Sequence, residues 1–92
     1  MEWKLFADLA EVAGDRHVTV DVEAGATVED AFEALLSDRP PLRDRVLDES
    51  GELREHINLL RNGENVFSQE EGWETELEAG DELALFPPVS GG

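Results

Sequence analysis

The end of the sequence limits the fold more than any other stretch. Residues 83–86 are four consecutive apolar residues after the turn-forming residues 79–81, a pattern typical of a buried strand. Pro87 and Pro88 lack backbone donors and hold φ at about −65°, so a central sheet ladder cannot continue through them. We therefore expect a strand, a stiff exit and a flexible tip over residues 87–92, which reaches about 20 Å when extended.

The sequence closes on Gly91 and Gly92. A terminal Gly-Gly is in general a frayed end without a role. However, two residues without Cβ can thread a narrow channel and present an unhindered carboxylate. A carboxylate becomes an acyl donor only when its oxygen is converted into a leaving group, as in an acyl-adenylate. In this interpretation the reactive group is the C-terminal carboxylate of Gly92 and not a side chain.

Three segments carry a resemblance to a known family. Residues 80–92, GDELALFPPVSGG, resemble the C-terminus of the small subunit of molybdopterin synthase. They are still more similar to the small archaeal modifier proteins of halophilic archaea, which are ubiquitin-like β-grasp proteins. Residues 1–14 and 56–64 match that family too, so the resemblance covers the whole chain, and the tail is its most specific part.

The resemblance implies an α+β fold of the ubiquitin-like β-grasp type. One main helix would pack on one face of a mixed sheet, and an extended Gly-Gly tail would follow. Residues 1–87 would form the domain and residues 88–92 the tail. In this family the first and last strands are parallel neighbours, so the tail would leave from the centre of the sheet.

The resemblance also implies a protein modifier and sulfur carrier of the molybdopterin synthase small subunit and ThiS-like type. An adenylating enzyme of the ubiquitin-activating type would use ATP to form an acyl-adenylate at Gly92. The product would be an isopeptide bond to target-protein lysines, or a thiocarboxylate used with the large subunit of molybdopterin synthase for molybdenum cofactor biosynthesis. This chain would bind no cofactor or metal and have no catalytic residues. The residues implied in tail recognition are Pro87, Pro88, Val89, Ser90 and Gly91.

Two alternatives remain open at this point. The chain could be a dedicated small subunit of molybdopterin synthase that is never conjugated to proteins. It could also be a non-covalent acidic interaction domain with an incidental Gly-Gly, which would keep its partners after the two glycines are removed. Lys4 is the only lysine, and so the only side chain that could accept an isopeptide bond within this chain; the simpler interpretation is an exposed strand lysine.

Periodic patterns predict the elements before the tail. Residues 28–36 place apolar side chains on one face of a helix that Thr27 would cap, and this is the strongest periodic signal. Asp8 and Glu11 have the spacing of a capping box, and Asn62-Gly63 is typical of a hairpin turn. Residues 64–78 have a weak pattern. The strands are expected at 2–6, 17–22, 56–61 and 83–86, and the core at Leu5, Val20, Phe32, Leu35, Ile57, Leu59 and Leu85.

Charge and composition exclude several classes of function. The chain has no cysteine, which excludes disulfides, thiolate metal sites and a cysteine nucleophile within it. His17 and His56 do not have the spacing of a ligand pair. With 23 acidic residues against 7 basic ones, no basic stripe could neutralise nucleic-acid phosphates. No apolar run indicates secretion or a membrane span, so we expect a cytoplasmic protein that is monomeric when free.

The formal net charge of −16, with one lysine among the basic residues, suits a cytoplasm of high salt; a partner-specific acidic face is the alternative. We predict a marked fall in the thermal unfolding midpoint between molar and about 0.1 M salt, because the Debye length rises from about 3 to about 10 Å. Circular dichroism recorded during heating measures this unfolding midpoint. A midpoint that is independent of salt over this range would contradict the halophilic interpretation.

Overall fold

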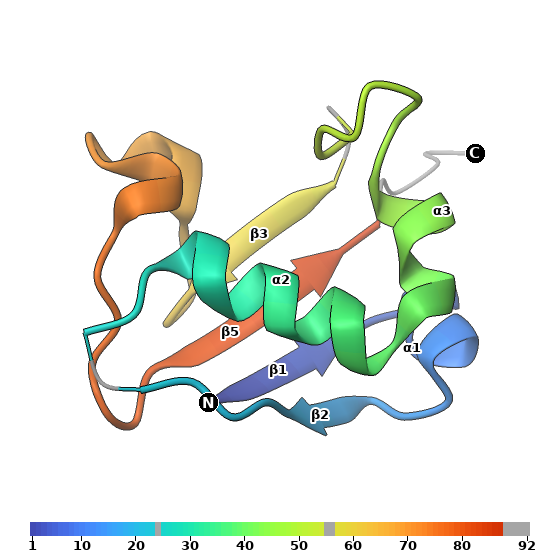
Figure 1. Cartoon of the computed structure of the whole chain (residues 1–92), viewed down its shortest axis with the longest axis horizontal. Coiled ribbons are helices and arrows are strands. Elements are labelled where there is room, and N and C mark those ends of the chain that lie inside the picture. Colours follow the sequence, from blue (N-terminus) through green and yellow to red (C-terminus); the bar gives the residue numbers. More distant parts are fainter. Residues whose placement is uncertain (24, 55–56, 88–92) are drawn as a thin grey trace.

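One mixed sheet forms the centre of the molecule. The structure is a computed structural model that describes residues 1–23, 25–54 and 57–87. Its sheet has five strands in the order β2-β1-β5-β3-β4, as Figure 1 shows for the larger strands. The strands are β1 (Glu2–Leu5), β2 (His17–Thr19), β3 (Asn58–Arg61), β4 (Glu64–Asn65) and β5 (Glu82–Phe86).

The first and last strands are parallel neighbours in the middle of the sheet. Their register runs from Glu2 opposite Glu82 to Leu5 opposite Leu85. β2 pairs antiparallel with the outer side of β1, and β3 pairs antiparallel with the other side of β5. This order is that of the β-grasp, which confirms the expected fold and the central place of the last strand.

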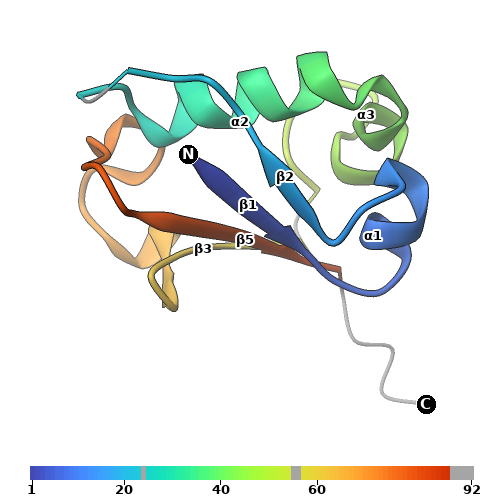
Figure 2. The same ribbon diagram turned by 90° about the horizontal axis from the view of Figure 1, so that it is seen from below.

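Helix α2 (Val28–Asp38) covers one face of the sheet, as the edge-on view of Figure 2 shows. The predicted cap is confirmed: the Asp30 backbone N–H donates to Thr27 Oγ1 at 3.2 Å, and the Thr27 backbone N–H donates to Asp30 Oδ2 at 3.0 Å. The whole apolar stripe of the helix is buried against the sheet. Its members are Val28, Ala31, Phe32, Leu35 and Leu36.

Trp3 connects the sheet to the helix. Its side chain is completely buried, and its indole Nε1–H donates to the Ala31 carbonyl oxygen at 3.2 Å. The Trp3 ring lies 6.2 Å from the Phe32 ring, measured between centroids. Every residue predicted for the core is buried, which confirms that list: Leu5, Val20, Phe32, Leu35, Ile57, Leu59 and Leu85.

Short helices close the domain around α2 and β3. η1 (Pro40–Leu42) and α3 (Arg43–Val46) follow α2. The Asn62-Gly63 turn is also confirmed, with φ of 51° and 86° at the two residues. The weakly patterned segment holds β4, η2 (Val66–Ser68) and η3 (Gly72–Glu74). No helix among the described residues has the length and apolar character needed to cross a membrane.

Local details of the prediction need correction. The capping box at Asp8 and Glu11 is wrong: α1 (Asp8–Ala13) already includes Asp8, and Ala7 precedes it without a side-chain cap. Gly14 does end this helix, at a φ of 90°. The second strand ends at Thr19 and not at residue 22, because β1, its pairing partner, begins at Glu2 opposite Thr19.

The first, third and last strands also differ from the expectation. The first ends at Leu5 rather than residue 6, and the third begins at Asn58. His56 lies outside the described residues. Only one face of β5 is fully buried: Leu83 and Leu85 are buried, whereas Ala84 and Phe86 lie half-buried on the face opposite α2.

Candidate functional site

The candidate site is the strand that carries the C-terminal tail. β5 has a paired strand on each side, and Leu83 and Leu85 point into the core with no exposed surface. A strand with two partners and a buried face cannot shift its register without exposing these side chains. The position at which the chain leaves the sheet is therefore determined by the core.

The end of β5 is held by an aromatic stack. The Phe86 ring lies on the Phe6 ring, with 4.1 Å between centroids and an interplanar angle of 10°. Pro87 follows, half-buried, and borders a hollow that Leu9 and Arg45 also line. Proline ends the strand as the sequence predicts. The other expected tail residues, Pro88, Val89, Ser90, Gly91 and Gly92, lie outside the described residues.

The start of β5 is held by Asp81, which the sequence analysis treated only as a turn residue. Its Oδ2 accepts from Arg61 Nε and from the Glu78 backbone N–H, both at 2.8 Å, and its Oδ1 accepts from Asn62 Nδ2 at 2.9 Å. Asn62 Oδ1 in turn accepts from the Glu82 backbone N–H at 2.9 Å. One carboxylate thus joins the turn before β5 to the hairpin after β3.

The ionised form of the Asp81 carboxyl group is stabilised although the residue is only 9% exposed. Burial by itself raises the pKa of this carboxyl. The hydrogen bonds from the Glu78 backbone, Asn62 and Arg61, with the positive charge of Arg61, outweigh burial and hold the pKa below its ordinary value of 3.8. The group is therefore an ionised anchor and not a proton donor at neutral pH.

Lys4 lies on the face of the sheet opposite α2. It stands opposite His17 of β2 and Ala84 of β5 in the strand register. Its Nζ is 3.1 Å from Glu82 Oε1, and 36% of its side chain is exposed. The amine is thus at the surface, next to the strand that carries the tail.

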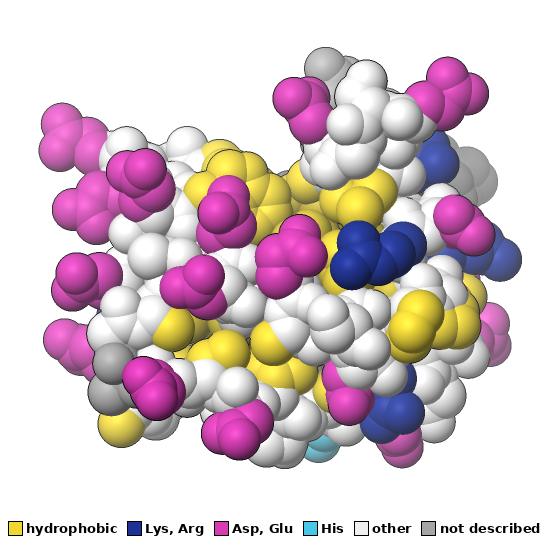
Figure 3. All heavy atoms as spheres, viewed as in Figure 1, with side chains coloured by type: hydrophobic (Ala, Val, Ile, Leu, Met, Phe, Trp, Pro, Cys, Tyr) yellow, Lys and Arg dark blue, Asp and Glu magenta, His cyan; other side chains and the backbone are white. Residues whose placement is uncertain are grey.

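Metal binding finds no support in the described part of the chain. There, no group of three or more His, Asp or Glu side chains is arranged to hold an ion. His17 is an exposed residue of β2. The acidic residues are dispersed over the visible surface, as the magenta side chains in Figure 3 show.

Comparisons with known proteins agree with this geometry. The model of the ThiS family matches residues 3–92. The chain belongs to the ThiS family. Small archaeal modifier protein 1 of Haloferax volcanii is 61% identical to this chain over 100% of both chains. A crystal structure of that protein has a TM-score of 0.88 at 60% identity, covering 100% of this chain and 98% of the other.

More distant members of the ThiS family group are similar as well. A putative sulfur carrier protein of Archaeoglobus fulgidus is 43% identical over 53% of this chain and 54% of its own length. A chain in the crystal structure of the Amycolatopsis orientalis BexX/CysO complex has a TM-score of 0.80 at 28% identity, covering 99% of this chain and 98% of that chain. The expected membership of a family of ubiquitin-like modifiers and sulfur carriers is confirmed.

Replacing Asp81 by Asn is expected to lower the free energy of unfolding by about 1–3 kcal/mol, because buried donors lose a charged acceptor. The lowered pKa gives this effect a pH dependence. Stabilisation by the Asp81 carboxylate is fully present above pH 3.8 and is lost as the pH falls through the lower folded-state pKa. Denaturant titration of both proteins at several pH values measures the difference.

The matched control is Asp21→Asn, which removes an exposed carboxylate of the same size. The difference between the native protein and Asp81→Asn should narrow below pH 3.8. If the difference in unfolding free energy stays constant down to the lowest pH at which both proteins fold, Asp81 does not act through its charge.

Proposed function

We propose that this chain is a ubiquitin-like modifier and sulfur carrier whose reactive group is the Gly92 carboxylate. Residues 1–87 would be the folded carrier, and residues 88–92 the tail that enters an activating enzyme. The observation that supports this most is the position of β5, which is paired with a strand on each side and ends at Phe86, directly before the half-buried Pro87.

The chemistry requires a second protein. A carboxylate oxygen of Gly92 would attack the α-phosphorus of ATP on an adenylating enzyme of the ubiquitin-activating type, and pyrophosphate would leave. The acyl-adenylate then has two fates, both releasing AMP: attack by a target lysine amine, which loses a proton, gives an isopeptide bond, and attack by hydrosulfide, a nucleophile at the sulfide oxidation level, gives a thiocarboxylate. In this scheme the enzyme supplies the catalytic groups, and this chain supplies the acyl group.

The thiocarboxylate would serve as the sulfur donor for molybdopterin synthesis together with the large synthase subunit. The similarity to a modifier protein of Haloferax volcanii over the full length of both chains favours conjugation in addition to sulfur transfer. We therefore prefer the double role over a synthase subunit that is never conjugated. Both fates branch from one activated species, so both depend on the same terminal glycine.

Deletion of Gly92, or Gly91→Val, is predicted to suppress ATP-dependent adenylation and to leave the fold intact. A Cβ at residue 91 restricts φ and ψ and adds bulk beside the reacting carbon. A displacement of about 1 Å can cost about 100-fold in rate. The measurement is pyrophosphate exchange with the purified activating enzyme from the same cell.

Circular dichroism confirms that each variant is folded, and Asp21→Asn, a change at an exposed residue outside the tail, is the control. Loss of both glycines should abolish protein conjugates and the thiocarboxylate together. Normal exchange with the truncated chain would mean that the tail is not the reactive group.

Lys4→Arg is predicted to abolish chains of this protein linked to itself, while the positive charge that pairs with the Glu82 carboxylate is kept. The other amine is less available, because the Met1 amino group donates to the Val20 carbonyl oxygen at 3.0 Å. The products of activation are separated by gel electrophoresis, and Gly-Gly remnants are located by mass spectrometry. The assignment of Lys4 as the acceptor would be contradicted if the native protein formed no linked chains. It would also be contradicted if the variant still formed chains linked through any site but the amino terminus.

A further inference from the structure

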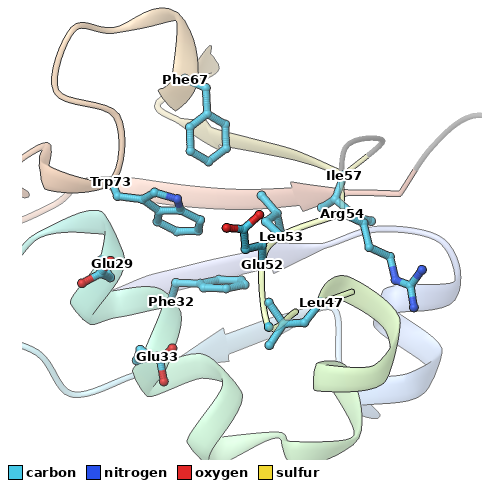
Figure 4. Close-up of a pocket in the computed structure, with 11 residues that line it drawn as sticks. Glu29, Phe32, Glu33, Leu47, Glu52, Leu53, Arg54, Ile57, Phe67 and Trp73 are labelled. Atoms are coloured by element: carbon cyan, nitrogen blue, oxygen red, sulfur yellow. The ribbon is translucent and has the colours of Figure 1, made fainter. Parts of the chain in front are cut away.

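A groove of about 510 Å³ lies on the helical side of the molecule, away from β5. Its walls come from three parts of the chain: helix α2, the segment 47–54 and the short helices η2 and η3. Figure 4 shows these parts facing one another across the groove. Its volume is in the range of pockets that hold a small ligand or a few side chains.

Aromatic rings form one wall and the floor of the groove. The Trp73 ring lies 5.1 Å from the Phe67 ring in an edge-to-face arrangement, and 5.1 Å from the Phe32 ring. Phe32 is buried, Trp73 is half-buried, and Phe67 is 44% exposed. Of the large apolar side chains in the described residues, only Phe67 and Phe6 are exposed. Accessible aromatic surface of this kind is typical of the central contacts of protein interfaces.

Three carboxylates line the groove beside the aromatic rings, and one of them, that of Glu33, lies 3.7 Å from Arg43 Nη2. Glu29 and Glu33 line the groove from α2, and Glu52 lines it from the opposite segment. Figure 4 shows the Glu52 carboxylate directed into the space between the walls. The lining also contains Arg54, whose Nη2 donates to the Asp44 carbonyl oxygen at 3.3 Å. Figure 3 shows hydrophobic side chains in a hollow, with acidic side chains and one basic side chain around it.

Two properties of the groove thus favour the same kind of ligand group. An aromatic ring face attracts a cation, and neighbouring carboxylates strengthen the attraction. Arginine satisfies both demands better than lysine, because its planar guanidinium stacks on rings and is more weakly hydrated. In high salt the exposed charges are screened, so the free energy of binding must come mainly from apolar contact with the rings.

We propose that this aromatic groove is a non-covalent docking site for a segment of a partner protein that presents an arginine between large apolar side chains. The groove lining contains no residue of β5. Glu52, Leu53, Arg54 and Ile57 line both this groove and the hollow that Pro87 borders. A docked partner is therefore held beside the base of the tail, whatever chemistry the tail performs.

The test uses the full-length protein in molar salt, without ATP or any enzyme, so it does not depend on the proposed activation of Gly92. The probe is a capped peptide with one Arg between two pairs of Leu in a Gly-Ser background. A second peptide replaces Arg by uncharged citrulline, and a third replaces every Leu by Ser. Binding is followed by Trp fluorescence and by amide chemical shifts of the isotopically labelled protein.

The Arg peptide is expected to bind saturably and to shift the amides of the groove. Citrulline should weaken binding about three- to fivefold, the scale of an exposed cation–π contact. The Ser peptide should not bind measurably. No saturable binding of the Arg peptide, or equal affinity for all three peptides, would overturn the proposal.

Variants locate the site. Phe67→Ala should weaken binding of the Arg peptide by at least about fivefold, as expected for a central interface aromatic. Phe6→Ala, which removes the exposed aromatic ring from the end of β1, is the matched control and should leave the affinity unchanged. Equal losses in the two variants, or chemical shifts centred on β1 and β5, would overturn the proposal.

The role of the carboxylate is tested separately. Glu52→Gln should lower the preference for Arg over citrulline, whereas Glu49→Gln, in the same loop but outside the groove lining, should retain it in full. A preference that survives Glu52→Gln unchanged would show that Glu52 does not select the cation. Chemical shifts of the native protein identify the groove even where a variant folds poorly.

Discussion

The parallel pairing of β1 with β5, covered by α2, is the contact on which the rest of the structure depends. These strands come from opposite ends of the chain, so their pairing closes nearly the whole sequence into one unit. Trp3 of β1 links this strand pair to the helix: the indole is fully buried, and its N–H donates to the Ala31 carbonyl oxygen in α2. Such an aromatic side chain combines a large buried area with a directed hydrogen bond, so it fixes both the distance and the orientation of helix and sheet.

The two ends of β5 are held by different interactions. At its start, the ionised Asp81 joins the preceding turn to the hairpin of β3. At its end, Phe86 stacks on Phe6, and Pro87 stops the pairing. A rigid strand that ends at the surface allows the domain to act as a handle, while the proposed chemistry takes place at the terminus beyond it. In the proposed function, this chain would supply the acyl group and the activating enzyme would supply the catalytic groups.

The acidic surface and the aromatic groove have different physical roles. Exposed ion pairs such as Lys4 with Glu82 contribute little net stability, and the dispersed carboxylates mainly solvate the surface. Phe67 and Trp73 are exceptions on that surface, because they leave aromatic area accessible beside the carboxylate of Glu52. The lining of the proposed docking site includes no residue of β5, the strand that precedes the proposed reactive tail.

Local patterns in the sequence determined the helix stripe, the Thr27 cap, the Asn62-Gly63 turn and the stop at Pro87, because each depends on residues within a few positions of one another. The β-grasp order came from the resemblance of the whole chain to a family, and the strand pairing confirmed it. The Asp81 network and the aromatic groove were decided only by the tertiary structure. Asp81 meets Arg61 across 20 positions, and Phe32 of α2 meets Trp73 of η3. Nothing in the local sequence pattern encodes such contacts, since they exist only after the core has brought distant segments together.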